Sequence, residues 1–168
     1  MISWRTLVFG LSLLLAPGLG VAQESPFGGF KHDSKAPIEI TADSLEVRQA
    51  ESIAIFQGNV VAGQGTLRLT ATVMRVAFDP DQENPETGAI TNVKADGQVF
   101  LTNGAETAQG DAAEYDVTTG LVTMSDNVVL TQGENVLTGQ SLRIDLNTGV
   151  AQVIGRVKSI FTPPNSSN

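Results

Sequence analysis

Side chains that could carry out chemistry are scarce in this chain. There is no cysteine, which excludes thiol catalysis, disulfides and cysteine-ligated metals. The only histidine, His32, stands in a polar segment with two adjacent glycines, where a fixed acid–base site is not expected. None of the serine-hydrolase, zinc-protease or phosphate-loop motifs occurs. The sequence therefore predicts a protein that is not an enzyme, with no catalytic residue and no cofactor.

Carboxylates are the chemically active groups that remain. Asp79, Asp81 and Glu83 alternate like the first ligands of a calcium-binding loop. However, the sixth position holds Asn84 where such a loop requires glycine, and the twelfth holds Ile90 rather than glutamate. A solvated acidic turn is the better interpretation, so we expect no metal site.

The first 22 residues have the order of a secretory signal peptide. Arg5 supplies a positive charge, residues 7–19 are mostly apolar, and Gly20-Val21-Ala22 offers a small-x-small cleavage site. The apolar run is too short for a good membrane span, although an uncleaved anchor helix is the alternative. We therefore expect export, with residues 1–22 removed.

The rest of the chain has the composition of one domain between two polar ends. Residues 23–36 are predicted to be a flexible leader, 37–161 the folded domain and 162–168 a disordered tail. The net charge of −8 should repel nucleic acid and anionic membrane surfaces. We therefore expect no nucleic-acid partner.

An internal repeat organises the predicted domain. Two series of residues recur at spacings of 29 residues, with one spacing of 39 in each series. Both series place the extra ten residues around 79–88, a stretch with the composition of a loop. Because two independent series agree on one insertion, about four 29-residue units are indicated. The series begin at Ala42, Ala71, Gly110 and Gly139, and at Gly58, Gly97, Asp126 and Gly155.

Each unit has the alternating pattern of β-strands. Aligned positions two residues apart are apolar in every unit, which predicts one apolar wall through an all-β fold. The column between two of them reads Glu46, Arg75, Glu114 and Arg143, so we expect a ladder of opposite charges between neighbouring units on the outer face. Asp111 and Glu114 are interpreted as turn and ladder residues, not as a catalytic pair. The apolar columns include Leu45, Met74, Ala113 and Leu142; Val47, Val76, Tyr115 and Ile144; and Val60, Val99, Val128 and Val157.

Ordered motifs within the repeat resemble those of a known family. Residues 37–43, P-I-E-I-T-A-D, precede 56–60, F-Q-G-N-V, and related segments recur at 110–115 and 139–144. In this order, over about 37–161, they resemble the LptA (OstA-like) family of lipopolysaccharide-transport proteins. The resemblance implies an all-β jellyroll, sometimes called a β-taco, of two facing antiparallel sheets.

The resemblance also implies a function. Family members are periplasmic and hold the lipid A acyl chains of lipopolysaccharide in an apolar groove between the sheets. They stack end to end by β-strand addition into a bridge from the inner to the outer membrane. The implied partners are lipopolysaccharide, an LptC-like inner-membrane protein, an LptD-like outer-membrane protein and further copies of the chain. The alternatives are an LptC-like relative or a structural exported β-solenoid with a closed core.

Two sets of residues follow as candidate sites. The apolar columns taken alone favour a closed sandwich core, whereas the resemblance favours a groove that binds lipid. The expected groove-lining positions are Ile38, Ile40, Phe56, Met74, Val99, Leu101, Met124, Leu130 and Leu142. The expected oligomer edges, where unpaired backbone would accept another strand, are Ile38, Glu39, Ile40, Val157, Lys158 and Ile160.

Overall fold

The structure is a computed structural model that describes residues 29–30, 33, 35–79 and 90–162. Within these residues the chain forms ten strands and one 3-10 turn, η1 (Gln49–Glu51). The strands are β1 (Ile38–Thr41), β2 (Ser44–Arg48), β3 (Ile53–Gln64), β4 (Leu67–Phe78), β5 (Ile90–Thr102), β6 (Glu106–Asp116), β7 (Leu121–Gln132), β8 (Asn135–Asp145), β9 (Val150–Ile154) and β10 (Lys158–Ile160). The predicted signal peptide, most of the leader and insertion, and residues 163–168 of the tail lie outside the described residues.

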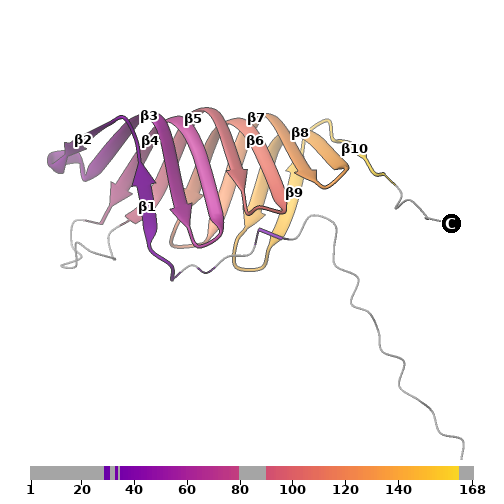
Figure 1. The fold of residues 1–168 in the computed structure, drawn as a ribbon, viewed down its shortest axis with the longest axis horizontal. Coiled ribbons are helices and arrows are strands. Elements are labelled where there is room, and N and C mark those ends of the chain that lie inside the picture. The colour runs from indigo at the N-terminus through magenta and orange to yellow at the C-terminus, as the bar shows by residue number, and fades with distance from the viewer. Residues whose placement is uncertain (1–28, 31–32, 34, 80–89, 163–168) are drawn as a thin grey trace, which may run out of the picture.

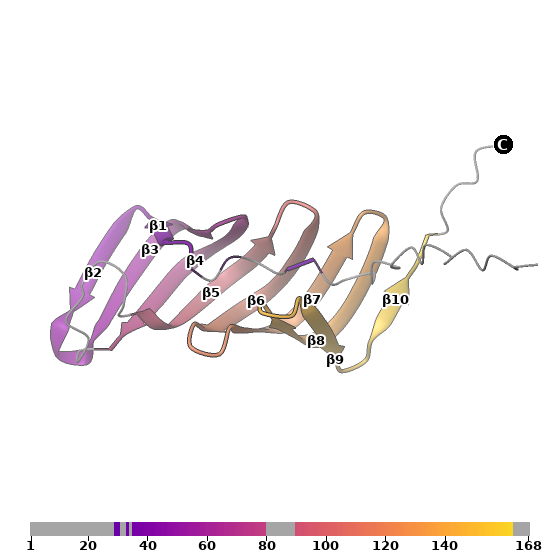
Figure 2. The same cartoon turned by 90° about the horizontal axis from the view of Figure 1, so that it is seen from below.

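All ten strands belong to one antiparallel sheet in which strands β3 to β8 follow one another in sequence order (Figures 1 and 2). At each end of this sheet, two short strands pair with different halves of one long strand. At one end, β1 pairs with the second half of β3 while β2 pairs with its first half. At the other end, β9 and β10 divide β8 in the same way. Each end of the sheet is therefore formed by two short strands.

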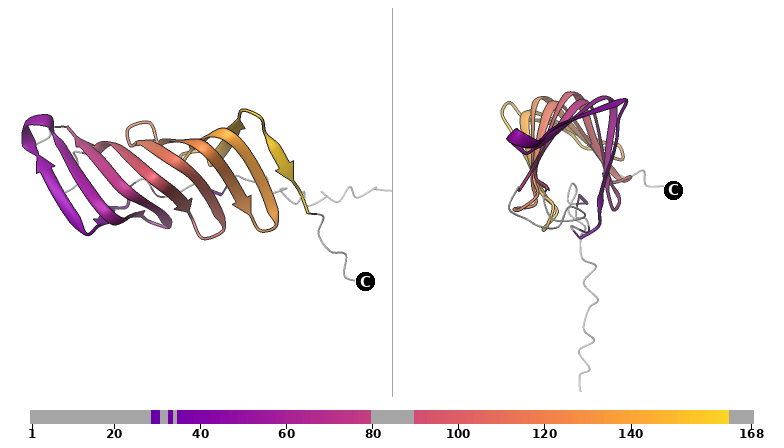
Figure 3. Two further views of the ribbon diagram at one scale, coloured as in Figure 1. Left: turned by 90° about the horizontal axis from the view of Figure 1, so that it is seen from above. Right: turned by 90° about the vertical axis from the view of Figure 1, so that its left-hand side faces the viewer.

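The sheet folds over along a line that crosses the middle of every long strand. At each crossing the pairing register shifts, which marks a β-bulge that bends the strand. Viewed from the end, the result is an arch that is open on one side (Figure 3, right). The first wall comprises 44–48, 53–57, 73–78, 90–96, 112–116, 121–125, 141–145 and 150–154. The second wall comprises 38–41, 60–64, 67–70, 99–102, 106–109, 128–132, 135–139 and 158–160.

The bends explain one of the two repeated series in the sequence. Each member of this series begins with two consecutive residues of positive φ. On β5, for example, Gly97 and Gln98 have φ of 83° and 51°. A Cβ atom at Gly97 would lie 2.7 Å from Thr72 Oγ1, so glycine serves both the backbone angle and the close approach. The equivalent pairs are Gly58 and Asn59, Asp126 and Asn127, and Gly155 and Arg156.

The other repeated series holds these bends in place. Asn59 donates from Nδ2 to Asp43 Oδ2 at 2.8 Å, and Asn127 donates from Nδ2 to Asp111 Oδ2 at 2.6 Å. In the second unit Thr72 donates from Oγ1 to the carbonyl oxygen of Gly97 at 3.1 Å. The prediction that Asp111 is a turn residue is wrong, because it lies within β6 and accepts a hydrogen bond across a bend. The repeated motifs encode a recurring fold line.

The predicted ladder of charges between neighbouring units is wrong. Each 29-residue unit contributes two neighbouring strands to the sheet. Equivalent residues of successive units are therefore separated by one intervening strand and do not face each other. Arg75 instead forms an ion pair with Asp96 at 2.5 Å, and Lys94 pairs with Glu114 at 3.5 Å. These pairs are about half exposed, so each stabilises the fold little.

The predicted fold class is confirmed. The chain is nearly all β, and its two facing walls are halves of one continuous, folded-over sheet rather than two separate sheets. Because side chains alternate along each strand, one face of every strand points between the walls. This geometry places the apolar columns of the repeat on the inside of the arch.

Candidate functional site

The space between the walls is filled by one contiguous cluster of apolar side chains. Met74, Met124 and Leu142 from the first wall are completely buried, as is Val60 from the second. Ala95 and Ala108 lie in the same cluster and add little bulk. Methionine side chains are flexible and repack easily around neighbours of different shape.

All nine predicted groove positions lie on this interior face. Seven of the positions are on strands that have a neighbouring strand on both sides. The other two, Ile38 and Ile40, are on the edge strand β1. Ile38 lines a cavity between the walls, while Ile40 and Phe56 are partly buried against the cluster. The other six are buried within it: Met74, Val99, Leu101, Met124, Leu130 and Leu142. Contact of these nine residues with lipid stays a prediction.

A small apolar cavity remains between the walls near β1. Its volume is about 50 Å³, and its lining includes Ile38, Leu69, Met74, Leu101 and Leu146. In this measure, the space open to the centre of a water-sized sphere, one water needs about 10–15 Å³, so the cavity has room for a few water molecules.

Tyr115 and Gln64 join the two walls across this cavity. The Tyr115 hydroxyl, from the first wall, donates to Gln64 Oε1, from the second, at 3.3 Å. Gln64 also donates from Nε2 to the backbone carbonyl of Ala36 at 3.0 Å. Burial, and to a smaller extent the neighbouring Asp116, raise the pKa of Tyr115, so the hydroxyl keeps the proton that it donates.

The sequence patterns did not predict that Phe30, Glu106 and Leu146 are buried. Phe30, in the predicted leader, is completely buried in the cluster, and the Glu106 side chain is completely buried on the second wall. No periodic pattern surrounds Phe30, so no sequence feature identified it. Leu146 is also buried, and its turn could have been recognised because Asp145 and Gly149 recur 29 residues after Asp116 and Gly120.

The recurring turn has a clear physical basis at Asp145. Its carboxylate accepts backbone N–H bonds from Asn147 at 2.9 Å and Thr148 at 3.2 Å. These bonds hold the pKa of Asp145 below its usual value. The turn directs Leu146 back between the walls, where it covers one side of the cavity.

The two ends of the arch expose the apolar columns that its middle buries. Leu45 and Val47 on β2 are 55% and 60% exposed, and Val157 is 50% exposed. Two of their equivalents in the central units, Met74 and Val99, are at most 1% exposed. The end residues lack only a neighbouring strand to cover them.

The predicted edge residues occupy part of these ends. Ile38, Glu39 and Ile40 belong to β1, while Lys158 and Ile160 belong to β10. Val157 lies at the last bend and outside either strand. The prediction omitted β2 and β9, because a fold line that splits each end into two strands was not evident from the sequence.

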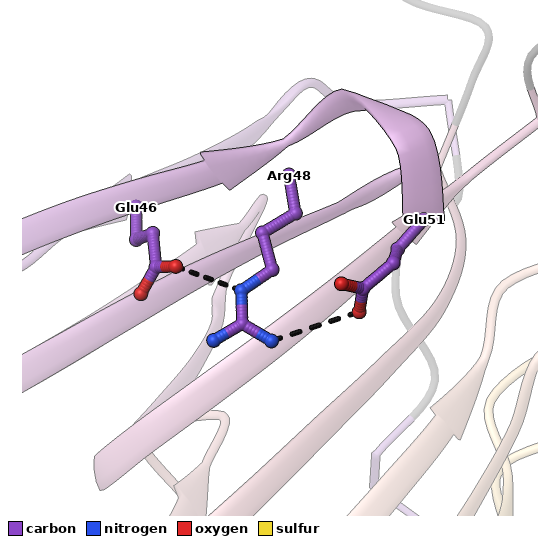
Figure 4. A network of polar contacts seen from close by, with 3 residues as sticks. All are labelled: Glu46, Arg48 and Glu51. Atoms are coloured by element: carbon purple, nitrogen blue, oxygen red, sulfur yellow. Dashed lines mark hydrogen bonds and ion pairs between the residues drawn. The ribbon is translucent and has the colours of Figure 1, made fainter.

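A small ionic cluster lies at the turn after β2 (Figure 4). Arg48 donates from Nε to Glu46 Oε1 at 2.7 Å, and its Nη1 lies 3.6 Å from Glu51 Oε2. The hydrogen bond and charge of Glu46, followed by the charge of Glu51, raise the pKa of Arg48. The cluster is exposed, so its ion pairs stabilise the fold little.

Metal binding and membrane crossing are two further questions for the described part of the chain. It holds no group of three or more His, Asp or Glu residues placed to bind a metal, and no helix long and apolar enough to cross a membrane. His32 and most of the acidic stretch that resembled a calcium loop lie outside the described residues.

Known proteins share this folded-over antiparallel sheet with an apolar interior. Residues 39–150 match the family model "LptA/(LptD N-terminal domain) LPS transport protein". The chain belongs to this family of lipopolysaccharide-transport proteins.

Two relatives and one solved structure illustrate the match. An uncharacterized protein of Rhizobium meliloti is 34% identical over 160 residues, covering 92% of this chain and 86% of the relative. The lipopolysaccharide export system protein LptH of Pseudomonas aeruginosa is 25% identical, covering 94% and 87%. The crystal structure of that LptH, described as the LptA-homologous periplasmic component of the transport device, superposes with a TM-score of 0.68 at 21% identity. That superposition covers 78% of this chain and 99% of LptH.

Proposed function

We propose that this protein is a periplasmic carrier that holds the lipid A acyl chains of lipopolysaccharide between the two walls of its arch. The observation that carries this proposal is the contiguous apolar interior, to which both walls contribute along the strand order β3 to β8. Burial of alkyl chains among such side chains is favourable by about 0.8 kcal/mol per methylene group. Residues 1–22 would direct the chain to the periplasm and then be removed.

The nine groove positions divide between the walls in a way that suits this role. Four belong to the first wall and five to the second, so an acyl chain between them would be enclosed from both sides. The Tyr115–Gln64 contact would break or shift as the walls part to admit it. The proposal needs no cofactor and no catalytic step.

The ends of the arch support end-to-end assembly. Exposed apolar residues on β2 and near the last bend stand where another unit of the repeat would bury them. The outer backbone groups of β1, β2, β9 and β10 pair with no further strand in the sheet. Strand addition by a second copy, an LptC-like inner-membrane protein or an LptD-like outer-membrane protein would satisfy both features. Such an assembly would bridge the two membranes.

The small cavity favours a second candidate, a structural exported β-solenoid with a closed core. An LptC-like relative is the other alternative. Lipid binding separates the carrier from the solenoid, because a closed core has no reason to open for lipid A.

The test compares two variants that add the same bulk to opposite faces of β3. Ala62 lines the cavity, whereas its neighbour Val61 is 37% exposed on the outer face. Replacing Ala62→Trp should weaken binding of detergent-solubilised lipid A about tenfold or more, and Val61→Trp should leave it unchanged. Thermal melts of both variants would verify that they are folded, and sedimentation at several concentrations would follow self-association. Absence of lipid A binding by the unmodified protein would refute the carrier function and favour the solenoid.

A further inference from the structure

A short segment before the first strand packs back into the arch. Phe30 has no exposed surface and belongs to the same apolar cluster as the predicted groove residues Leu101 and Leu130. Gly29 donates its backbone N–H to Glu106 Oε2 at 2.9 Å, and Asn103 donates from Nδ2 to the Gly29 carbonyl at 2.5 Å. We call residues 29–30, 33 and 35–36 the strap.

A second attachment holds the strap near β1. Gln64 donates from Nε2 to the carbonyl oxygen of Ala36 at 3.0 Å, and Ala36 closes a turn by donating to the Asp33 carbonyl at 3.1 Å. Gln64 is the last residue of β3 and Glu106 is the first residue of β6, so both attachment points belong to the second wall. They lie at strand ends, which form the free margin of that wall. The strap is thus attached at two points along the open side of the arch (Figure 1).

The contact at Gly29 has the features of a fitted site. A Cβ atom there would lie 2.9 Å from Glu106 Oε2 and 3.3 Å from Asn103 Nδ2, so a larger residue would have to displace the Glu106 carboxylate. Glu106 is completely buried, and a buried carboxylate must receive hydrogen bonds to avoid a large desolvation cost. The backbone of the strap supplies one of those donors.

The position of the strap coincides with the groove. Ala108 is the next inward-facing residue after Glu106 on β6, and it pairs with Leu101 on one side and Leu130 on the other. Both partners are predicted to contact acyl chains. A buried phenylalanine ring at this point therefore occupies space that a lipid chain would need.

We infer that the strap is an internal competitor for the groove, with Phe30 occupying an acyl-chain position until lipid displaces it. This inference rests on the proposed carrier function. A docked strap keeps water out of the interior of the empty carrier. It also reduces the apparent lipid affinity to the intrinsic affinity multiplied by the fraction of time that the strap is undocked. Lipid can then enter this part of the groove only when the strap is released from it.

The test uses Phe30→Ala, with Phe100→Ala as a matched control. Phe100 loses the same atoms from β5 but faces outward, since its neighbours Val99 and Leu101 are the buried residues. Phe30→Ala should bind detergent-solubilised lipid A about tenfold more tightly than the unmodified protein, the factor for a strap docked roughly nine-tenths of the time. Phe100→Ala should bind lipid A with the same affinity as the unmodified protein.

A fluorescent variant reports the strap itself, independently of any change in stability. Trp4 is the only tryptophan in the chain, so the full chain carrying Trp4→Phe and Phe30→Trp has one indole, at the strap. Its emission should be that of a buried indole without lipid and shift to that of an exposed one as lipid A saturates.

The outcomes separate this inference from the carrier function. If lipid A binds all variants equally, or binds without moving the indole emission, the strap is structural and the inference is overturned while the carrier function stands. If lipid A binds neither the unmodified protein nor Phe30→Ala, both are overturned. Tighter binding by Phe30→Ala together with the emission shift supports the exchange.

Discussion

The middle of the arch and its two ends are built from the same repeated columns, but they differ in what covers them. Leu142, in a central position, is completely buried between β7 and β9, whereas its equivalent Leu45 on β2 is 55% exposed. The same comparison holds between Val128, which is 1% exposed, and Val157, which is 50% exposed. Each unit therefore depends on its neighbours for burial, and the apolar residues at the ends stay exposed in a single copy.

The stability contribution of one column should follow this difference closely. Leu142→Ala removes buried methyl groups and is expected to lower the free energy of unfolding by about 2–5 kcal/mol. Leu45→Ala makes the same chemical change at the exposed end and is expected to cost about 0.5 kcal/mol or less. Urea unfolding of both variants, at a concentration where the protein is monomeric, measures the two values. Equal losses would show that the ends are buried by some other part of the chain.

The bends should be sensitive where the two walls of the arch meet closely. Gly97 and Gly104 both have positive φ, but only Gly97 has a neighbour within reach of an added Cβ, since nothing lies within 4 Å at Gly104. Gly97→Ala is therefore expected to destabilise the protein by about 1–2 kcal/mol more than Gly104→Ala. Thermal unfolding of the pair provides the measurement, and identical melting temperatures would argue against a tightly packed fold line.

Self-association should depend on the ends and not on the middle. Val47→Asp places a charge among the exposed apolar residues of β2 and is expected to weaken association between copies about tenfold, or roughly 1.4 kcal/mol. Val129→Asp makes the same change on the outer face of β7 and should leave association unchanged. Analytical ultracentrifugation over a range of concentrations distinguishes them. An effect of Val129→Asp as large as that of Val47→Asp would place the contact elsewhere.

The smallest expected effect concerns Tyr115, the only tyrosine in the chain. Because burial raises its pKa, the folded state holds the phenolic proton more tightly than the unfolded state, whose tyrosine titrates near 10.0. Stability should therefore be complete below about pH 10 and fall as the pH rises through the folded-state pKa. The ultraviolet absorbance of tyrosinate follows this single group directly, and Tyr115→Phe should remove its share of the alkaline loss of stability. A folded-state pKa at or below 10.0 would contradict the buried position.

The sequence predicted the parts of this molecule that repeat. Alternating apolar residues and the 29-residue period are local patterns, and they led to the all-β fold and to interior positions such as Met74. The charge ladder failed because a period does not reveal how many strands one unit contributes. The strap was missed because Phe30 stands in a polar stretch, and only the folded arch brings it to Glu106.

The most direct test of the carrier function is site-specific photo-crosslinking to lipid A from the two faces of one wall. A photoreactive phenylalanine derivative at Phe56 would point between the walls, while the same group at Arg75, on the strand beside it, would point outward. We expect crosslinks to lipid A from position 56 and none from position 75. Crosslinks from position 75 without any from position 56 would contradict the groove as the lipid-binding site.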